Sequence, residues 1–208
     1  MDEFASSRPL DYTNPLSGDF GPREIRLIPG EGPEFRSEVN FSSFAAHFSW
    51  QVMSEWCWAA SISNVFAYYK HPVSQDRIVK DVYKDITNMP ALSASMIAQE
   101  INKSWDDDNG VPFSAHLTAA YDFQAGVYAI NNESMIRELD AGRPLIVCNS
   151  HHCMVVTAIE YTKFSVKTVG VFDPWPRVGA RGLTLAEMLP KNNGGDLMFL
   201  GSLTVSSD

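Results

Sequence analysis

Apolar residues in the middle of the chain recur at the spacing of a helix. Between residues 56 and 69 they form one stripe that includes Ala59, Ile62 and Phe66, and this period predicts a helix. The His71-Pro72 pair stops the helix, because proline disfavours the helical conformation for the residue before it. Capping serines and a terminating glycine predict further short helices: from Ser74, from Ser93 or Ser95, over residues 133–141 before Gly142, and near residues 185–189.

Past residue 142 the pattern changes to short apolar segments. Three of them lie between residues 142 and 175, rich in Val and Ile and bounded by Gly, Pro, Asn and Ser, as adjacent strands are. His152 stands at the start of the middle strand and Asp173 at the end of the next one. The end of one antiparallel strand faces the start of its neighbour, so we expect these two side chains to meet. The apolar pattern of residues 197–205 predicts a last strand.

The separation of helical and strand patterns predicts an α+β fold. The chain has 208 residues, of which 45% are hydrophobic. That is enough for one sizeable core or for two small lobes that share a cleft. Residues 1–40 differ, because they hold five prolines and show no sustained helical period. We expect an N-terminal arm or leader there, partly disordered, with residues 25–28 as a strand docked on the body.

The charge of the chain argues against a nucleic-acid partner. Its formal net charge is −9, whereas phosphates attract a basic surface. No apolar run approaches the length of a membrane helix, which argues against membrane insertion, and the first residues lack the pattern of a cleavable signal peptide. We therefore expect a soluble protein that is cytoplasmic or exported by a route independent of a signal peptide.

The segment from Gln51 to Ser61 carries the strongest chemical signal. Cys57 lies between two tryptophans at the start of the predicted helix, where unpaired N–H groups and the helix dipole favour a reactive thiolate. The side-chain amide of Gln51 and the N–H of Cys57 are the expected donors to an oxyanion. The competing interpretation is that Cys57 is a small buried hydrophobic residue.

A histidine and an aspartate from the strands complete the chemistry. An imidazole can activate a thiol, and a carboxylate can hold that imidazole in the required tautomer. Alternation along the strand does not choose between His151 and His152, because both faces of the strand are apolar. Asp173 competes with a simpler role, that of capping a turn before Pro174, in which case Asn149 is the next candidate for the third member.

These segments together resemble the papain-like cysteine peptidases, above all the staphopains and the papain-like effector peptidases of plant-pathogenic bacteria. The resemblance covers roughly residues 51–175. It implies a catalytic domain over residues 41–208, in which a helical lobe of about residues 50–140 carries the nucleophile. That lobe packs against an antiparallel β lobe of about residues 141–208 that carries the histidine and the aspartate.

The resemblance also implies a role for each matched residue: Cys57 as nucleophile, His152 as general base, Asp173 as orienting group and Gln51 as oxyanion donor. It favours His152 over His151, although His151 stands where the family usually has glycine. Trp175 is expected to shield the bond between Asp173 and His152 from water.

The remaining candidate ligands predict neither a metal nor a cofactor. A zinc site built from His151, His152 and Cys153 lacks a second ligand pair at zinc spacing. The acidic residues 106–108 lack the other positions of a calcium loop. For Cys148 and Cys153 we expect free buried thiols.

The expected function is that of a cysteine endopeptidase working through a thiolate–imidazolium pair and an acyl-enzyme intermediate on a protein or peptide substrate. From the resemblance to effectors we also expect that the protein is delivered into another cell and that its substrate is a host or target-cell protein. Three alternatives remain open at this point: an acyl transferase or deamidase with the same Cys-His-Asp triad, an enzyme that processes only itself, and a non-catalytic binding domain.

Overall fold

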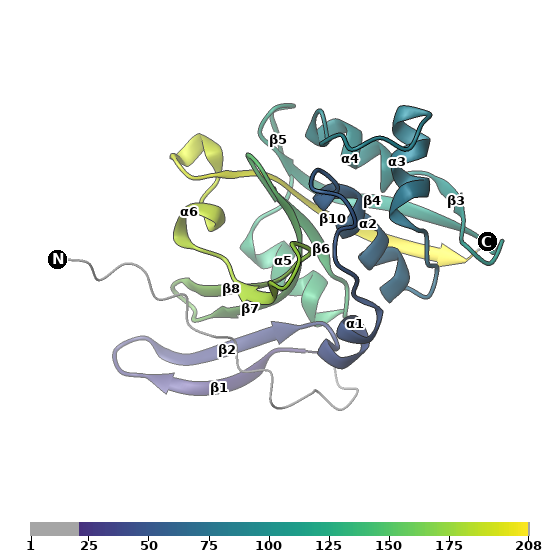
Figure 1. The fold of residues 1–208 in the computed structure, drawn as a ribbon. Helices are drawn as coiled ribbons and strands as arrows, with labels where there is room; N and C mark the ends of the chain where they lie inside the picture. The colour runs from purple at the N-terminus through teal and green to yellow at the C-terminus, as the bar shows by residue number, and fades with distance from the viewer. Residues whose placement is uncertain (1–20, 208) are drawn as a thin grey trace.

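The computed structural model describes residues 21–207. Within this range, helices lie beside one antiparallel sheet of ten strands (Figure 1), which confirms the predicted α+β class. The helices are α1 (Phe41–His47), α2 (Cys57–Tyr68), α3 (Gln75–Tyr83), α4 (Ala94–Glu100), α5 (Asn132–Asp140) and α6 (Leu185–Met188), with a 3-10 turn at Lys191–Asn193. The strands are β1 (Arg23–Ile28), β2 (Gly32–Glu38), β3 (Ser104–Asp106), β4 (Pro112–Asp122), β5 (Val127–Tyr128), β6 (Leu145–Asn149), β7 (Cys153–Tyr161), β8 (Val166–Asp173), β9 (Gly179–Gly182) and β10 (Leu197–Ser207).

Helix α2 is the central helix of the fold. Its residues from Trp58 to Phe66 are all buried, including the polar Ser63 and Asn64, whose side chains donate hydrogen bonds to backbone carbonyls. It packs against α1 and α3 and against the strands β6 and β7. The chain leaves the helix through Lys70, which adopts a left-handed conformation with φ of 72° just before the His71-Pro72 pair. The predicted helix and its stop signal are both confirmed.

The predicted capping residues of the shorter helices occupy the expected positions, although one of them makes no capping hydrogen bond. Ser93, not Ser95, caps α4 by accepting a hydrogen bond from the N–H of Met96. Gly142, with φ of 71°, follows α5 at the position that favours glycine. Ser74 occupies the N-cap position of α3, but its side chain makes no capping hydrogen bond.

Strand β7 lies inside the sheet and pairs along both of its edges. One edge pairs with β6 and then with β2, and the other pairs with β8, always in antiparallel register. On the far side of β6, the sheet continues through β10 to β4 and β3. In Figure 1, α2, α3 and α4 gather beside the sheet, where α2 contacts β7.

The strand expected at residues 25–28 is confirmed as part of β1, but other strands of the sheet were not predicted. Together with β2, which was not predicted, β1 forms a hairpin over residues 23–38 that joins the body through β7; residues 1–20 of the expected arm lie outside the described residues. No strand was predicted between residues 104 and 128, yet β3, β4 and β5 lie there. The small and polar residues of β4 show no clear alternation of apolar and polar positions. The strand conformation of β4 is instead stabilised by its long pairing with β10. No helix between residues 21 and 207 is long and apolar enough to span a bilayer.

Candidate active site

Cys57 is the first residue of α2 and is partly exposed. The two tryptophans beside it explain why the helix starts at this point. The indole N–H of Trp56 donates to the carbonyl of Thr87, and that of Trp58 donates to the carbonyl of Met89. Both buried rings therefore find a polar partner in the segment between α3 and α4. This anchoring fixes the helix start and presents the thiol at a position with unpaired backbone N–H groups.

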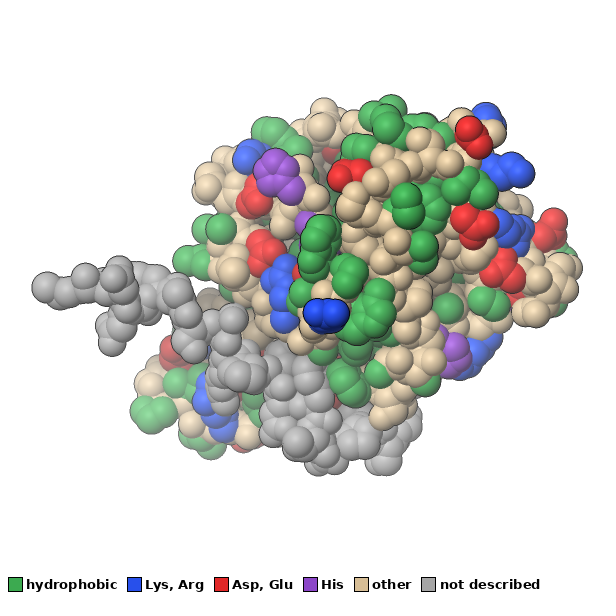
Figure 2. Space-filling view, in the orientation of Figure 1, with side chains coloured by type: hydrophobic (Ala, Val, Ile, Leu, Met, Phe, Trp, Pro, Cys, Tyr) green, Lys and Arg blue, Asp and Glu red, His purple; other side chains and the backbone are tan. Residues whose placement is uncertain are grey.

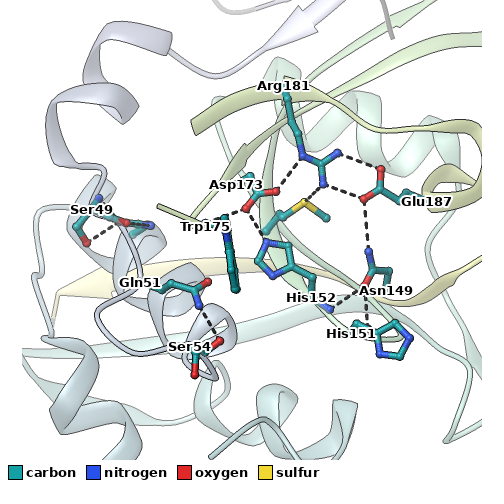
Figure 3. Close-up of polar contacts among 12 residues, drawn as sticks. Ser49, Gln51, Ser54, Asn149, His151, His152, Asp173, Trp175, Arg181 and Glu187 are labelled. Carbon is teal, nitrogen blue, oxygen red and sulfur yellow. Dashed lines mark hydrogen bonds and ion pairs between the residues drawn. The ribbon is translucent and has the colours of Figure 1, made fainter. Parts of the chain in front are cut away.

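The ring of His152 lies next to Asp173, as the strand order predicted. The distance from His152 Nε2 to Asp173 Oδ1 is 2.6 Å. His151 is exposed, and in Figure 3 its ring points away from Asp173. The turn between β6 and β7 therefore places His152, and not His151, beside Asp173. Asn149 Oδ1 holds this turn by accepting hydrogen bonds from the backbone N–H groups of both His151 and His152. Asn149 thus holds the main chain of the turn and does not contact the imidazole through these bonds.

The charges around His152 stabilise its protonated form. Burial of the ring lowers its pKa, but hydrogen bonds and negative charge from Asp173 and Cys57 outweigh burial and raise the pKa of His152 to about 9. Since Nε2 is bonded to Asp173, Nδ1 is the ring nitrogen left for the sulfur of Cys57. Burial raises the pKa of Asp173, but its bonds to His152, Trp175 and Arg181 bring it below its ordinary value. The arrangement therefore favours an imidazolium at His152 beside an ionised Asp173.

Trp175 lies at the edge of this pair. Its ring centroid is 6.2 Å from that of His152, with the planes nearly perpendicular, and its backbone N–H donates to Asp173 Oδ1. Its side chain remains 48% exposed. One face of the indole can therefore shield the bond between His152 and Asp173 while the rest of the ring meets solvent.

Gln51 lies close to the strand that carries Asp173, and its side chain is buried. Its backbone N–H donates to the carbonyl of Pro174 at 2.8 Å. The side-chain Nε2 donates to the carbonyls of Met53 and Ser54, whereas Oε1 is buried without a partner (Figure 3). In this structure the amide N–H groups are engaged locally. Donation from Gln51 to an oxyanion stays a prediction.

A cavity of about 420 Å³ opens beside the thiol. Its walls come from the start of α2, from α4 and the segment before it, from the turns between β4 and β5 and between β6 and β7, and from β10. The lining residues include Cys57, Leu92, Gln124, Asn149 and His152. Hydrophobic side chains gather on the face of the molecule shown in Figure 2. Exposed ones in the segments that flank the site are Trp50, Val52, Met53, Leu92 and Trp175.

The expectation of free thiols at Cys148 and Cys153 was wrong, because the two residues form a disulfide. They face each other directly in the register of β6 and β7, with their Cα atoms 4.0 Å apart. Opposed residues of an antiparallel pair project to the same face, and that geometry brings the two sulfurs together. Cys57 is the free cysteine of the described residues.

Two polar residues of the site, Arg181 and Glu187, were not found from the sequence. Arg181 Nε donates to Asp173 Oδ2 at 2.9 Å, and the guanidinium also binds both carboxylate oxygens of Glu187. Arg181 lies in β9, in a stretch for which the sequence analysis predicted no element. The available signal was the spacing from Thr184 to Glu187, which matches a capping box, and the structure confirms that box at the start of α6.

Comparisons with solved structures find chains of similar arrangement but low identity. One is described as a double glycine motif protease from an AMS/PCAT transporter in complex with the leader peptide. It is 17% identical, with a TM-score of 0.41, and the alignment covers 76% of this chain and 89% of that one. Another is described as the peptidase domain of Streptococcus ComA, a bifunctional ABC transporter involved in a quorum-sensing pathway. It is 13% identical, with a TM-score of 0.44, covering 77% of this chain and 97% of that one.

These similarities are too weak to carry an argument about this chain, and no curated protein matches it. A family model does match, over residues 38–188, and that range includes Gln51, Cys57, His152 and Asp173. The matched range covers most of the chain, so the chain belongs to the Peptidase_C39 like family and is a cysteine peptidase of papain-like fold.

Proposed function

We propose that the protein is an endopeptidase that uses Cys57 as nucleophile, His152 as general acid and base, and Asp173 as the group that orients His152. The observation that carries the proposal is the placement of the His152 ring between the Asp173 carboxylate and the Cys57 thiol. A nucleophile, a base and an orienting carboxylate within reach of one another are what this chemistry requires.

The reaction follows from this geometry in two stages. The Cys57 thiolate attacks the carbonyl carbon of a peptide bond, and the oxygen becomes an oxyanion close to the start of α2. The N–H of Cys57 is one donor for that oxyanion, and Gln51 is the second if its amide turns from the carbonyls of Met53 and Ser54 during turnover. His152 then gives its Nδ1 proton to the leaving amine, and a thioester to Cys57 remains.

Hydrolysis of the thioester reverses the roles. Neutral His152 removes a proton from a water molecule, the resulting hydroxide attacks the thioester carbonyl, and the carboxylic acid product leaves as the thiolate–imidazolium pair forms again. Asp173 keeps Nε2 protonated throughout, so that Nδ1 is always the atom that exchanges the proton.

The substrate that suits the cleft is a peptide with apolar side chains. The cavity beside Cys57 has a mixed lining, and exposed hydrophobic residues such as Val52 and Leu92 lie in the segments that flank it. Delivery into another cell, with a host protein as substrate, stays a prediction.

Incubation with a library of fluorogenic peptides tests the proposal, with Cys57→Ala as the inactive variant and Cys148→Ala/Cys153→Ala, which leaves no unpaired thiol from the disulfide, as the cysteine control. We expect cleavage by the wild type and by the double variant, and none by Cys57→Ala. Product masses separate the alternatives: hydrolysis leaves two shorter peptides, deamidation leaves the peptide whole, and acyl transfer attaches an added amine. Turnover by Cys57→Ala at even a tenth of the wild-type rate would rule out Cys57 as the nucleophile.

A further inference from the structure

Both oxygens of the Asp173 carboxylate are bound, each to a different partner. Oδ1 accepts from His152 and from the N–H of Trp175, and Oδ2 accepts from Arg181 Nε. A carboxylate held by one oxygen can still rotate about the bond to its Cβ atom. The second anchor removes that freedom, and it comes from β9, the strand that pairs with β8 beside Asp173.

Arg181 is itself held in place by a second acid. Its two terminal nitrogens bind the two oxygens of Glu187 at 3.0 and 2.8 Å, and one of them also contacts the sulfur of buried Met154. Glu187 is fixed in turn by the capping box with Thr184. The planar guanidinium of an arginine can bind one carboxylate through both terminal nitrogens while its Nε–H binds another, a fixed geometry that a lysine ammonium does not reproduce.

Glu187 also reaches back to the turn that carries His152. Its Oε1 accepts from Asn149 Nδ2 at 3.4 Å, and Asn149 Oδ1 accepts from the N–H of His152. The contacts therefore close a ring that starts at the imidazole of His152 and returns to its main chain (Figure 3). The ring joins β6, β7, β8, β9 and the start of α6.

We propose that Arg181 and Glu187 are positioning residues of the site: they lock the Asp173 carboxylate and the turn bearing His152 in one arrangement and cancel each other's charge. The role deepens the proposed peptidase function and rests on it. Arg181 alone would place a cation beside Asp173 and weaken the attraction of Asp173 for the imidazolium. Because Glu187 compensates that cation, Asp173 keeps its full effect on His152.

The groups that set the charge state of His152 come from several elements. Cys57 and Asp173 contact the ring, while Arg181 and Glu187 act through Asp173. The ionisable groups that line the same cavity are Glu55, before α2, and His151, in the turn between β6 and β7. Replacement of Glu187 alters one of these charges and leaves the ring contacts of His152 in place.

A matched pair elsewhere in the chain provides controls. Arg143 binds Glu138 through two hydrogen bonds at the end of α5, and the exposed fractions of these side chains resemble those of Arg181 and Glu187. The variants Arg181→Met, Arg181→Lys and Glu187→Gln are therefore compared with Arg143→Met and Glu138→Gln.

Arg181→Met should lower kcat about 10- to 100-fold with little change in KM, because a small misplacement at a catalytic group has an effect of that order. Arg181→Lys should recover part of the loss, and Arg143→Met should keep the wild-type kcat. In Glu187→Gln the uncompensated Arg181 should lower the pKa of His152, measured by NMR titration of the histidine rings, while Glu138→Gln should leave it unchanged.

The proposal is overturned if Arg181→Met and Arg143→Met retain the same kcat, or if His152 titrates identically in Glu187→Gln and Glu138→Gln. The NMR titration needs no substrate, so it decides the proposal even if no peptide is cleaved. It also decides the proposal if Arg181→Met fails to fold, since Glu187→Gln keeps the guanidinium.

Discussion

His152 is the proposed general acid and base of the site, and its ring interacts with both Asp173 and Cys57. Asp173 binds Nε2 at 2.6 Å, and Cys57 interacts with the other side of the ring. A lone buried histidine prefers to be neutral, but here the two anions reverse that preference. The protonated ring is what a thiolate partner and a proton donor to the leaving amine both require.

Replacement of each of the two adjacent histidines should separate their roles. His152→Ala removes the general acid and base and should lower kcat/KM by about 100- to 10,000-fold. His151→Ala removes an exposed ring that does not face Asp173, so most of the rate should remain. Steady-state kinetics with one cleaved peptide make the comparison. A larger loss in His151→Ala than in His152→Ala would reverse the assignment.

The charge of Asp173 should set the upper limit of the pH range. The thiolate–imidazolium pair exists only while His152 is protonated, so kcat/KM should fall as the pH rises through about 9, the raised pKa of His152. Asp173→Asn keeps a hydrogen-bonding group but removes the negative charge, which lowers the pKa of His152 and moves this alkaline limb to lower pH.

Asp173→Ala, which removes the hydrogen bond as well, should lose most of the activity. The pH dependence of kcat/KM in the three proteins checks both expectations. An alkaline limb in Asp173→Asn at the same pH as in the wild type would show that another group holds the imidazolium.

The hairpin of β6 and β7 is the element that brings the histidine to the cleft, and the Cys148–Cys153 disulfide closes its turn. The bridge spans a sequence separation of 5, so the chain-entropy estimate for so short a loop is about 2 kcal/mol of stability. Cys148→Ala/Cys153→Ala should lose about that much in the free energy of unfolding.

The same double variant should keep most of its turnover, because Asn149 holds the turn independently of the bridge. Urea unfolding followed by circular dichroism measures the stability loss, and Cys57→Ala is the control for removal of a thiol. Equal midpoints for the wild type and the double variant under oxidising conditions would contradict a stabilising bridge.

Elements with a strong period or a clear punctuation signal could be predicted from the sequence, and others could not. The apolar stripe of α2 predicts a helix, and the Val-rich segments of β6, β7 and β8 predict strands, from local sequence alone. Strand β4 does not, because its order comes from pairing with β10, which is distant in sequence. The disulfide escaped prediction for the same reason: it depends on cross-strand register, which the alternation within one strand does not contain.

At the scale of the whole molecule, the site exists only where the helices meet the sheet. Cys57 comes from the start of α2, whereas His152 directly precedes β7 and Asp173 ends β8, about 100 residues later in the chain. The bond from the Gln51 N–H to the Pro174 carbonyl ties the two parts together next to the site. Motif and order in the sequence were enough to propose these partners, while the ring through Arg181, Glu187 and Asn149 required the assembled fold.

Covalent labelling with an epoxide thiol inhibitor, followed by peptide mapping, tests the pairing of Cys57 with His152 most directly. In the wild type and in His151→Ala, the adduct should form rapidly and lie on Cys57. In His152→Ala, which should remain folded, labelling should be slower by orders of magnitude, because the thiol then lacks the imidazole that activates it. An adduct on another residue, or labelling of Cys57 at the wild-type rate in His152→Ala, would contradict the account.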